Sequence, residues 1–170
     1  SLEGLALVQS VVGEIDFQTV DVSTIPLRVS AQIQVLRSIA TIQISLGEFE
    51  EARENLLLAL ELAQLSGNRI EEAIAKQFLG NIAMLDSDEA SRTDEFGTVF
   101  PAYRYALNQY QDALDLIERR GNASLLAQLY IDIGDARLVL ASSDEGTIND
   151  FTQAGIDYEL ALGQARSTSD

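Results

Sequence analysis

Apolar and polar residues follow one another along this chain with the period of an α-helix. Beyond the first thirty residues, apolar positions recur at steps of three and four, as at Leu36, Ile39 and Ala40. This spacing puts the apolar side chains on one face of a helix. The two prolines, Pro26 and Pro101, are each expected in the first turn of a helix, where a missing N–H costs little. The pattern therefore predicts an all-α chain.

One arrangement of residues occurs three times. An aromatic residue is followed by Ala three positions later, by a large residue after seven and by Ala again after ten. The three copies are Phe49, Ala52, Leu56 and Ala59; Tyr103, Ala106, Tyr110 and Ala113; and Phe151, Ala154, Tyr158 and Ala161. In a helix these positions share one face, where small residues let a neighbouring helix approach and large residues fill the gaps. The repetition predicts three copies of one helical unit.

Each copy follows an upstream helix that has its own recurring residues. These are Leu36, Ile39 and Ala40 before the first copy, Leu79 and Gly80 before the second, and Tyr130, Ile133 and Gly134 before the third. The two links between units are equally long and each contains a Gly-Asn pair, Gly67-Asn68 and Gly121-Asn122. Such a pair supplies a left-handed C-cap and a break between helices. The unit is therefore predicted to be helix–turn–helix.

This unit resembles the tetratricopeptide repeat, which carries a Leu-Gly pair in its first helix and Ala-x3-aromatic in its second. The matching residues are Leu79-Gly80, Ile133-Gly134, Ala106-x3-Tyr110 and Ala154-x3-Tyr158, with Leu46-Gly47-Glu48-Phe49 in place of the family's turn. The spacing exceeds the usual length of about 34 residues. It is similar to the longer repeats of kinesin light chains and of large bacterial regulatory proteins.

The resemblance implies a right-handed superhelix of about three repeats within residues 26–170. The repeats would span about 26–66, 67–120 and 121–167, after an N-terminal helix near Leu5–Val12 and a connection in residues 1–25. The chain departs from the family pattern at one position of each first helix. The family has an aromatic residue three positions after the small residue, which here is Ala40, Gly80 or Gly134. Gln43, Ala83 and Arg137 stand at those positions.

The resemblance also implies a concave groove lined by the first helix of each repeat. Its exposed positions would be Gln34, Arg37, Thr41 and Ser45; then Gln77, Asn81 and Met84; then Gln128, Ile131 and Asp135. Amide side chains can both donate to and accept from the backbone of an extended peptide. We therefore expect a groove that holds a peptide or protein segment. The alternative is that these polar residues only face water.

The second and third repeats are longer than the first between their two helices. The small residue and the aromatic residue are 9 apart in the first copy but 23 and 17 apart in the others, so these carry insertions of 14 and 8 residues. Both insertions fall at the same point of the unit, so we expect loops that project from one edge. Their acidic residues are Asp86, Asp88, Glu89, Asp94 and Glu95 in the second repeat, and Asp144 and Glu145 in the third.

These acidic residues allow two interpretations. In the functional one they form a docking edge or, as a weaker option, a cation site; in the other they are solvated loop residues that cap the next helix. Their spacing does not fit a calcium-binding loop, because no Gly stands at the sixth position.

Composition narrows the classes of function. The chain has 170 residues, of which 46% are hydrophobic, and 27 acidic against 11 basic residues give a net charge of −16. This charge repels phosphate backbones and anionic lipid surfaces, so it argues against nucleic acid and membranes and favours a basic partner. No apolar run reaches the roughly 18 residues of a membrane span. With neither Cys nor His, the chain lacks the residues of Ser-His-Asp triads, Cys-His nucleophiles and thiolate zinc sites.

Asp132 and Asp135 lie three apart and could form a catalytic acid pair, but the sequence has no nucleophile elbow or phosphate loop beside them. We therefore expect a non-catalytic interaction scaffold or regulatory module, without cofactor or metal, within a larger bacterial protein. Two alternatives stay open: a self-associating assembly module, since a solenoid without polar caps exposes an apolar end, and a receptor domain for a small peptide. The absence of Cys leaves the compartment open between cytoplasm and export.

Overall fold

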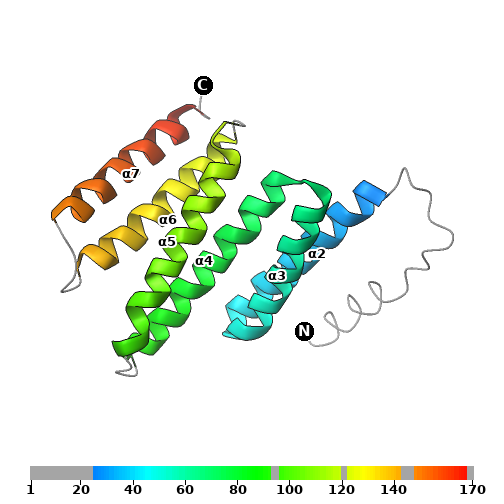
Figure 1. The fold of residues 1–170 in the computed structure, drawn as a ribbon, viewed down its shortest axis with the longest axis horizontal. Helices are drawn as coiled ribbons and strands as arrows, with labels where there is room; N and C mark the ends of the chain where they lie inside the picture. The colour runs from blue at the N-terminus through cyan, green and yellow to red at the C-terminus, as the bar shows by residue number, and fades with distance from the viewer. Residues whose placement is uncertain (1–24, 93–95, 120–121, 143–147, 168–170) are drawn as a thin grey trace. The chain divides into compact units, whose positions relative to one another are not determined.

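The computed structural model describes residues 25–92, 96–119, 122–142 and 148–167, and over these residues the chain is all-α, as predicted. Its helices pack in sequential pairs, α2 with α3, α4 with α5 and α6 with α7 (Figure 1). The described helices are α2 (Ile25–Leu46), α3 (Phe49–Ser66), α4 (Arg69–Arg92), α5 (Phe96–Ile117), α6 (Ala123–Ala141) and α7 (Ile148–Ser167). The helix predicted near Leu5–Val12 lies outside the described residues.

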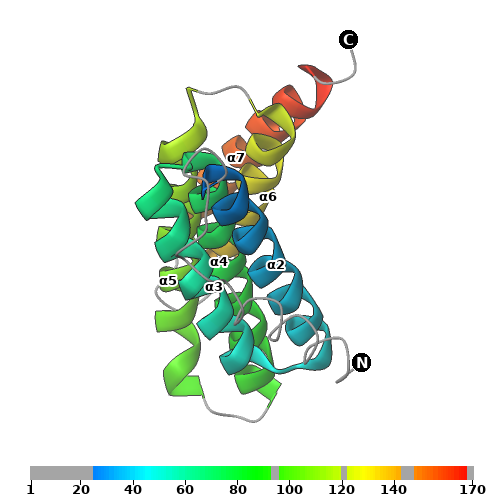
Figure 2. The same cartoon turned by 90° about the vertical axis from the view of Figure 1, so that its right-hand side faces the viewer.

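The chain forms two compact units, Ser1–Glu71 and Glu72–Asp170. The first unit contains α2, α3 and the first turn of α4, and the second contains the rest of α4 with α5, α6 and α7. Within the second unit α6 contacts both α5 and α7, and it lies between them in Figure 1. The same helices can be followed from the side in Figure 2.

The core of the first unit lies between α2 and α3. Ile33 and Leu36 of α2 pack against Ala59 and Ala63 of α3. The small alanines let the two helix backbones approach closely, and the branched side chains fill the space that remains. Each fully buried large apolar side chain contributes about 1.5–3 kcal/mol relative to an exposed one. This pairing is therefore stabilised mainly by the face that the repeated residues predict.

The core of the second unit is larger and draws on four helices. Its buried members are Ala73, Ala83, Ala106, Tyr110, Ala113, Ile117, Leu126, Leu129, Tyr130, Ile133, Ala136 and Ala161. The repeated Ala–large–Ala positions of α5 are all in it, as the sequence pattern predicts. On α7 the pattern holds less well, because Phe151 is 47% exposed. Helix α7 packs on α6, with Ala154 and Ala161 buried, but Phe151 near its N-terminal end stays half exposed.

The Gly-Asn pair between α3 and α4 has two separate roles. Gly67 is left-handed at φ 66° and ends α3, as predicted. Asn68 then begins α4, because its Oδ1 accepts a hydrogen bond of 3.3 Å from the backbone N–H of Glu71. Asn122 does the same for α6, accepting from the N–H of Leu125 at 3.1 Å. These asparagines are N-caps, which satisfy N–H groups that a helix leaves unpaired.

The insertion in the second repeat is not the loop that we predicted. Helix α4 continues to Arg92 and α5 begins at Phe96, so the added residues lengthen both helices. No Gly or Pro stands between Leu85 and Arg92 to end α4. The error came from placing the end of the helix by analogy with the first repeat.

The same extension corrects the position of one proline. Pro101 lies inside α5, five residues after Phe96, and not in the first turn. A proline there removes one intrahelical hydrogen bond. Pro26 is the second residue of α2, where the prediction is confirmed.

Candidate binding site

Several of the predicted groove positions meet at a surface pocket in the second unit. The pocket has a volume of about 300 Å³ and receives side chains from three helices. We call it the acidic pocket, and its lining residues are Asn81, Met84, Leu85, Tyr110, Asp132 and Asp135. Asn81, Met84 and Asp135 were predicted as groove positions from the sequence. The first helices of two successive pairs, α4 and α6, therefore supply most of this site.

Two glutamine side chains hold the carboxylate of Asp132. Gln77 Nε2 donates to Oδ2 at 2.6 Å, and Gln128 Nε2 donates to Oδ1 at 3.0 Å. Burial raises the pKa of Asp132, the two amide hydrogen bonds lower it, and the charge of Asp135 raises it again, with a net increase. The amides thus fix the orientation of a carboxylate whose negative charge is poorly solvated.

Two tyrosine hydroxyls hold the neighbouring polar groups of the pocket. Tyr110 Oη donates to Asn81 Oδ1 at 2.8 Å, and Tyr158 Oη donates to Asp135 Oδ1 at 2.7 Å. Burial and the hydrogen bond to Asp135 raise the pKa of Tyr158 to about 12. Burial and the charges of the two aspartates also raise the pKa of Tyr110. Both hydroxyls therefore stay protonated and act as donors at neutral pH.

The carboxylates of the acidic pocket have no cation to balance them among the residues that the structure describes. The bonds of Asp132 and Asp135 come from neutral amides and a phenol. Elsewhere in this unit, Asp112 pairs with Lys76 at 2.8 Å and Asp157 pairs with Arg137. The pocket is therefore a local centre of uncompensated negative charge.

Two predicted groove positions of this unit lie differently from expectation. Gln77 is only 6% exposed, because its amide turns inward to reach Asp132 on the neighbouring helix. It supports the pocket from within and offers little to a ligand. Ile131 is exposed on α6 but does not line the pocket. Gln128 is exposed and takes part through its bond to Asp132.

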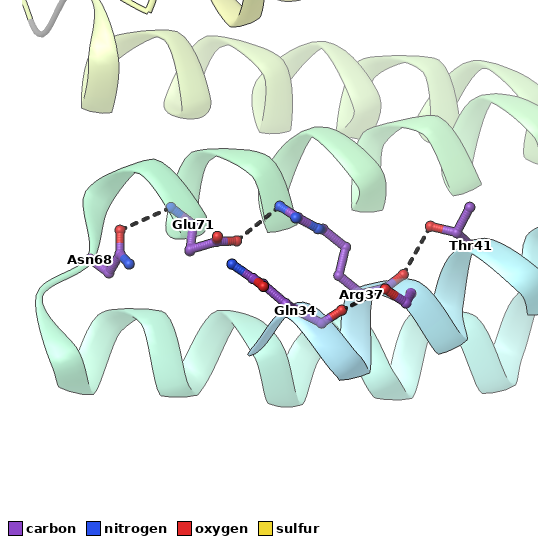
Figure 3. Close-up of polar contacts among 6 residues, drawn as sticks. Gln34, Arg37, Thr41, Asn68 and Glu71 are labelled. Carbon is purple, nitrogen blue, oxygen red and sulfur yellow. Dashed lines mark hydrogen bonds and ion pairs between the residues drawn. The ribbon is translucent and has the colours of Figure 1, made fainter. Parts of the chain in front are cut away.

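In the first unit the predicted positions serve mostly internal contacts. Arg37 Nη1 reaches Glu71 Oε2, in the first turn of α4, at 2.9 Å (Figure 3). Thr41 Oγ1 donates to the backbone oxygen of Arg37 at 2.9 Å, as Figure 3 also shows, and Ser45 Oγ donates to Ile42 O at 2.6 Å. The guanidinium and both hydroxyl donors are thus already engaged.

The remaining position of the first unit, Gln34, belongs to a different surface. It lies in an apolar groove of about 380 Å³ along α2, whose other lining residues are Ala31, Val35, Ser38, Ile39 and Ile42. The structure therefore does not gather Gln34, Arg37, Thr41 and Ser45 into one site as it does the positions of the second unit.

The predicted acidic edge is only partly within the described chain. Asp86 is exposed on α4, and Asp88 and Glu89 belong to the same helix. Asp94, Glu95, Asp144 and Glu145 lie outside the described residues. Over the part of the chain that is described, no three acidic side chains gather so that they could hold a metal ion. None of the described helices has both the length and the apolar character of a membrane span.

At two of the three positions where the tetratricopeptide pattern expects an aromatic residue, a polar side chain links the two helices of its pair. Asn55 Nδ2 donates to Gln43 Oε1 at 2.8 Å, linking α3 to α2. Arg137 pairs with the buried Asp157, linking α6 to α7. The corresponding Ala83 joins the apolar core. The departures from the pattern at Gln43 and Arg137 were identified from the sequence, but their partners were not. Each partner directly precedes the large residue of the repeated pattern, Asn55 before Leu56 and Asp157 before Tyr158.

Sequence reasoning also missed that Asp132 lines the same pocket as Asp135. Its spacing of three from Asp135, read only as a weak catalytic signal, was the available clue. In chemical terms the pocket can accept hydrogen bonds, attract a cation and contact an aliphatic chain. No model of a known protein family and no curated protein sequence matches the chain, so the resemblance to tetratricopeptide repeats stays a prediction.

Proposed function

We propose that this chain is a non-catalytic interaction module that binds a peptide or protein segment along α4 and α6 of its second unit. The observation that carries the proposal is the convergence of the predicted first-helix positions on the acidic pocket. In this proposal the three helix pairs are tetratricopeptide-like repeats of a right-handed superhelix, and the pocket belongs to its concave surface.

The polar groups of the pocket are already oriented, which supports binding. Tyr110 holds the amide of Asn81, and two glutamines hold the carboxylate of Asp132. A group that is fixed before binding loses little side-chain entropy when the ligand arrives. Such order at a partly exposed site is expected of a recognition surface.

The same contacts argue against catalysis at this pocket. A tyrosine nucleophile would need a lowered pKa or a nearby base that takes its proton. Tyr158 does donate to Asp135, but its pKa is raised to about 12, which is the opposite of activation. The pair therefore positions a carboxylate and does not prepare a nucleophile.

Selection from a random displayed peptide library tests the proposal directly. The immobilised chain should enrich peptides whose affinity falls at least about tenfold, or about 1.4 kcal/mol, in the variant N81A/Q128A. The matched control N108A/Q111A removes the same side-chain types from α5 and should change affinity by less than about twofold. Circular dichroism on each variant checks that helicity is kept. Equal losses in both variants would place binding elsewhere and contradict the proposal.

Self-association is a second candidate function, favoured by the surface of α7. Ile148 is 85% exposed and Phe151 is 47% exposed on this helix. Large apolar side chains exposed on one helix are typical of a protein–protein contact. Light scattering over a wide concentration range should then show dimers or larger species that disappear in F151E. A strictly monomeric chain at high concentration would rule this function out.

A further inference from the structure

We propose that the acidic pocket receives a lysine or arginine side chain of the bound segment. The cationic head would lie between Asp132 and Asp135, and the aliphatic stem would contact Met84 and Leu85. This inference rests on the proposed function and adds to it the residue type that the pocket recognises.

The first argument is the uncompensated charge of the pocket. The described residues supply no ion-pair partner for Asp132 or Asp135, whereas Asp112 and Asp157 of the same unit are each paired with a cation. Asp132 is half-buried, and a partly buried carboxylate is unfavourable until a cation or further donors reach it, whereas Asp135 beside it is exposed. A cation from a partner would therefore gain more here than at an exposed acid of the same chain.

The second argument is the spacing of the two carboxylates. Asp132 and Asp135 stand one turn apart on α6, so their Cβ atoms are about 5–6 Å from each other. The Gln and Tyr bonds each occupy one acceptor site on a carboxylate oxygen and leave others free. A guanidinium has five N–H donors in a planar fork and can reach both carboxylates at once. We therefore expect arginine to bind more tightly than lysine.

The third argument is the apolar wall of the pocket. Met84 and the exposed Leu85 lie beside the two acids. Lys and Arg combine a charged head with an aliphatic stem that packs on apolar surface. An inorganic cation would gain nothing from such a wall, and the described residues hold no group of three acids to ligate one. The lining thus favours a cationic side chain.

The fourth argument is that Asn81 can engage the backbone that carries this side chain. Its Oδ1 already accepts from Tyr110, which orients the amide and leaves the two N–H groups of its nitrogen as donors. A donor beside the pocket can bind a backbone carbonyl of an extended segment. Side-chain and backbone contacts together distinguish a peptide from a free amine.

The only Met of the sequence gives a direct probe, because Met84 lines the pocket. With its methyl carbon labelled with ¹³C, the chain is titrated with the peptides acetyl-Gly-Ser-X-Ser-Gly-amide, where X is Arg, Lys, norleucine or Glu. The Met84 signal should shift and saturate with Arg and Lys at a Kd on the order of 1 mM. The norleucine and Glu peptides should bind at least about tenfold more weakly.

Two double variants, each of which removes two negative charges, distinguish binding in this pocket from a general attraction of cationic peptides to an acidic protein. D132N/D135N should weaken binding of the Arg peptide at least about tenfold. D115N/E118Q removes two exposed negative charges, one near the C-terminal end of α5 and one in the turn just after it, and should have less than about a twofold effect. Circular dichroism confirms that both variants stay folded.

Three results would overturn the inference. They are equal binding of the norleucine and Arg peptides, equal losses in the two variants, and a Met84 signal unmoved by about 10 mM of either cationic peptide. Failure of this inference can be distinguished from failure of the proposed function. If binding of the library peptides requires Asn81 and Gln128 but the peptides are not enriched in basic residues, the proposed function stands and the inference is wrong.

Discussion

The ring of Tyr110 on α5 lies directly against the backbone of Gly80 on α4. A Cβ placed at Gly80 would meet the ring, at 2.9 Å from both Cδ1 and Cζ and closer still to Cε1. Tyr158 lies against Gly134 in the same way, with Cε1 at 2.8 Å. In both pairs the hydroxyl then bonds the residue that follows the glycine and lines the pocket. The close packing at the two glycines therefore places the tyrosine hydroxyls that hold Asn81 and Asp135 at the acidic pocket.

Replacing Gly80 by Ala should destabilise the protein. The added methyl would overlap the buried ring of Tyr110, and overpacking of this kind costs about 1–3 kcal/mol. The better helix propensity of Ala returns about 1 kcal/mol. Urea unfolding should thus show a net loss of up to about 2 kcal/mol.

The matched control is the same substitution on α7. A Cβ at Gly155 would have no heavy atom within 4 Å. G155A should therefore show only the propensity gain, about 0.5–1 kcal/mol of added stability. Equal effects at the two glycines would contradict the close contact at Gly80.

A double substitution tests whether the Tyr110 ring causes the cost. The first repeat has Ala40 and Leu56 at the positions of Gly80 and Tyr110, and both are fully buried. In a Y110L background, G80A should therefore be neutral or stabilising. The double-mutant cycle should give a coupling of about 1–2 kcal/mol. Strict additivity would show that the methyl meets some other group.

Removing Asp157 should be costly, because it is 4% exposed and pairs with Arg137. D157A leaves the guanidinium unpaired in a mostly buried place, and we expect a loss of about 2–4 kcal/mol in urea unfolding. The control is the pair of Arg53 and Glu50, at 3.7 Å, in which the Glu50 side chain is 79% exposed. E50A should change stability by less than about 0.5 kcal/mol. Comparable losses would mean that the buried pair contributes no more than a surface pair.

The pKa of Asp132 predicts how stability depends on pH. It is raised above its ordinary value of 3.8, so the folded protein binds this proton more tightly than the unfolded chain does. The contribution of this group to stability is therefore greatest below 3.8, falls as the pH rises through the raised pKa, and is lowest at neutral pH.

D132N removes the charge and keeps the size of the side chain, and the amides of Gln77 and Gln128 can turn to match it. The variant should be more stable than the parent chain at pH 7, with a gain that shrinks as the pH falls through the raised pKa. Urea unfolding at a series of pH values measures this difference. A variant that is less stable at neutral pH would show that the carboxylate stabilises the fold. A gain in stability at neutral pH is what we expect if Asp132 serves the cation binding that we propose, because functional residues often lower stability.

Much of the fold could be predicted from the sequence because packing is periodic. The buried face of α5, with Ala106, Tyr110 and Ala113, follows from spacing alone, and so does the left-handed end of α3 at Gly67. The extension of α4 could have been predicted too, since no residue between Leu85 and Arg92 ends a helix. The loop was predicted instead because the corresponding helix of the first repeat, α2, ends sooner after its small residue.

The candidate site was less predictable, because it depends on contacts between helices far apart in the sequence. Asn81, Met84 and Asp135 were found from their place in the repeat, but periodicity could not show that Gln77 turns inward to Asp132. Nor could it show that Arg37 is engaged by Glu71. Side-chain geometry decides which polar residues are open to a ligand and which bond to one another within the protein.

The most direct test is to find out whether a peptide selected from the library binds at the acidic pocket. The ¹³C-methyl signal of Met84 is followed while a library-selected peptide is added, and calorimetry on the same sample gives the affinity. We predict that the signal shifts along the binding curve and saturates with the calorimetric Kd. A peptide that binds by calorimetry while the Met84 signal stays unmoved would contradict the account, because binding would then lie away from the acidic pocket of α4 and α6.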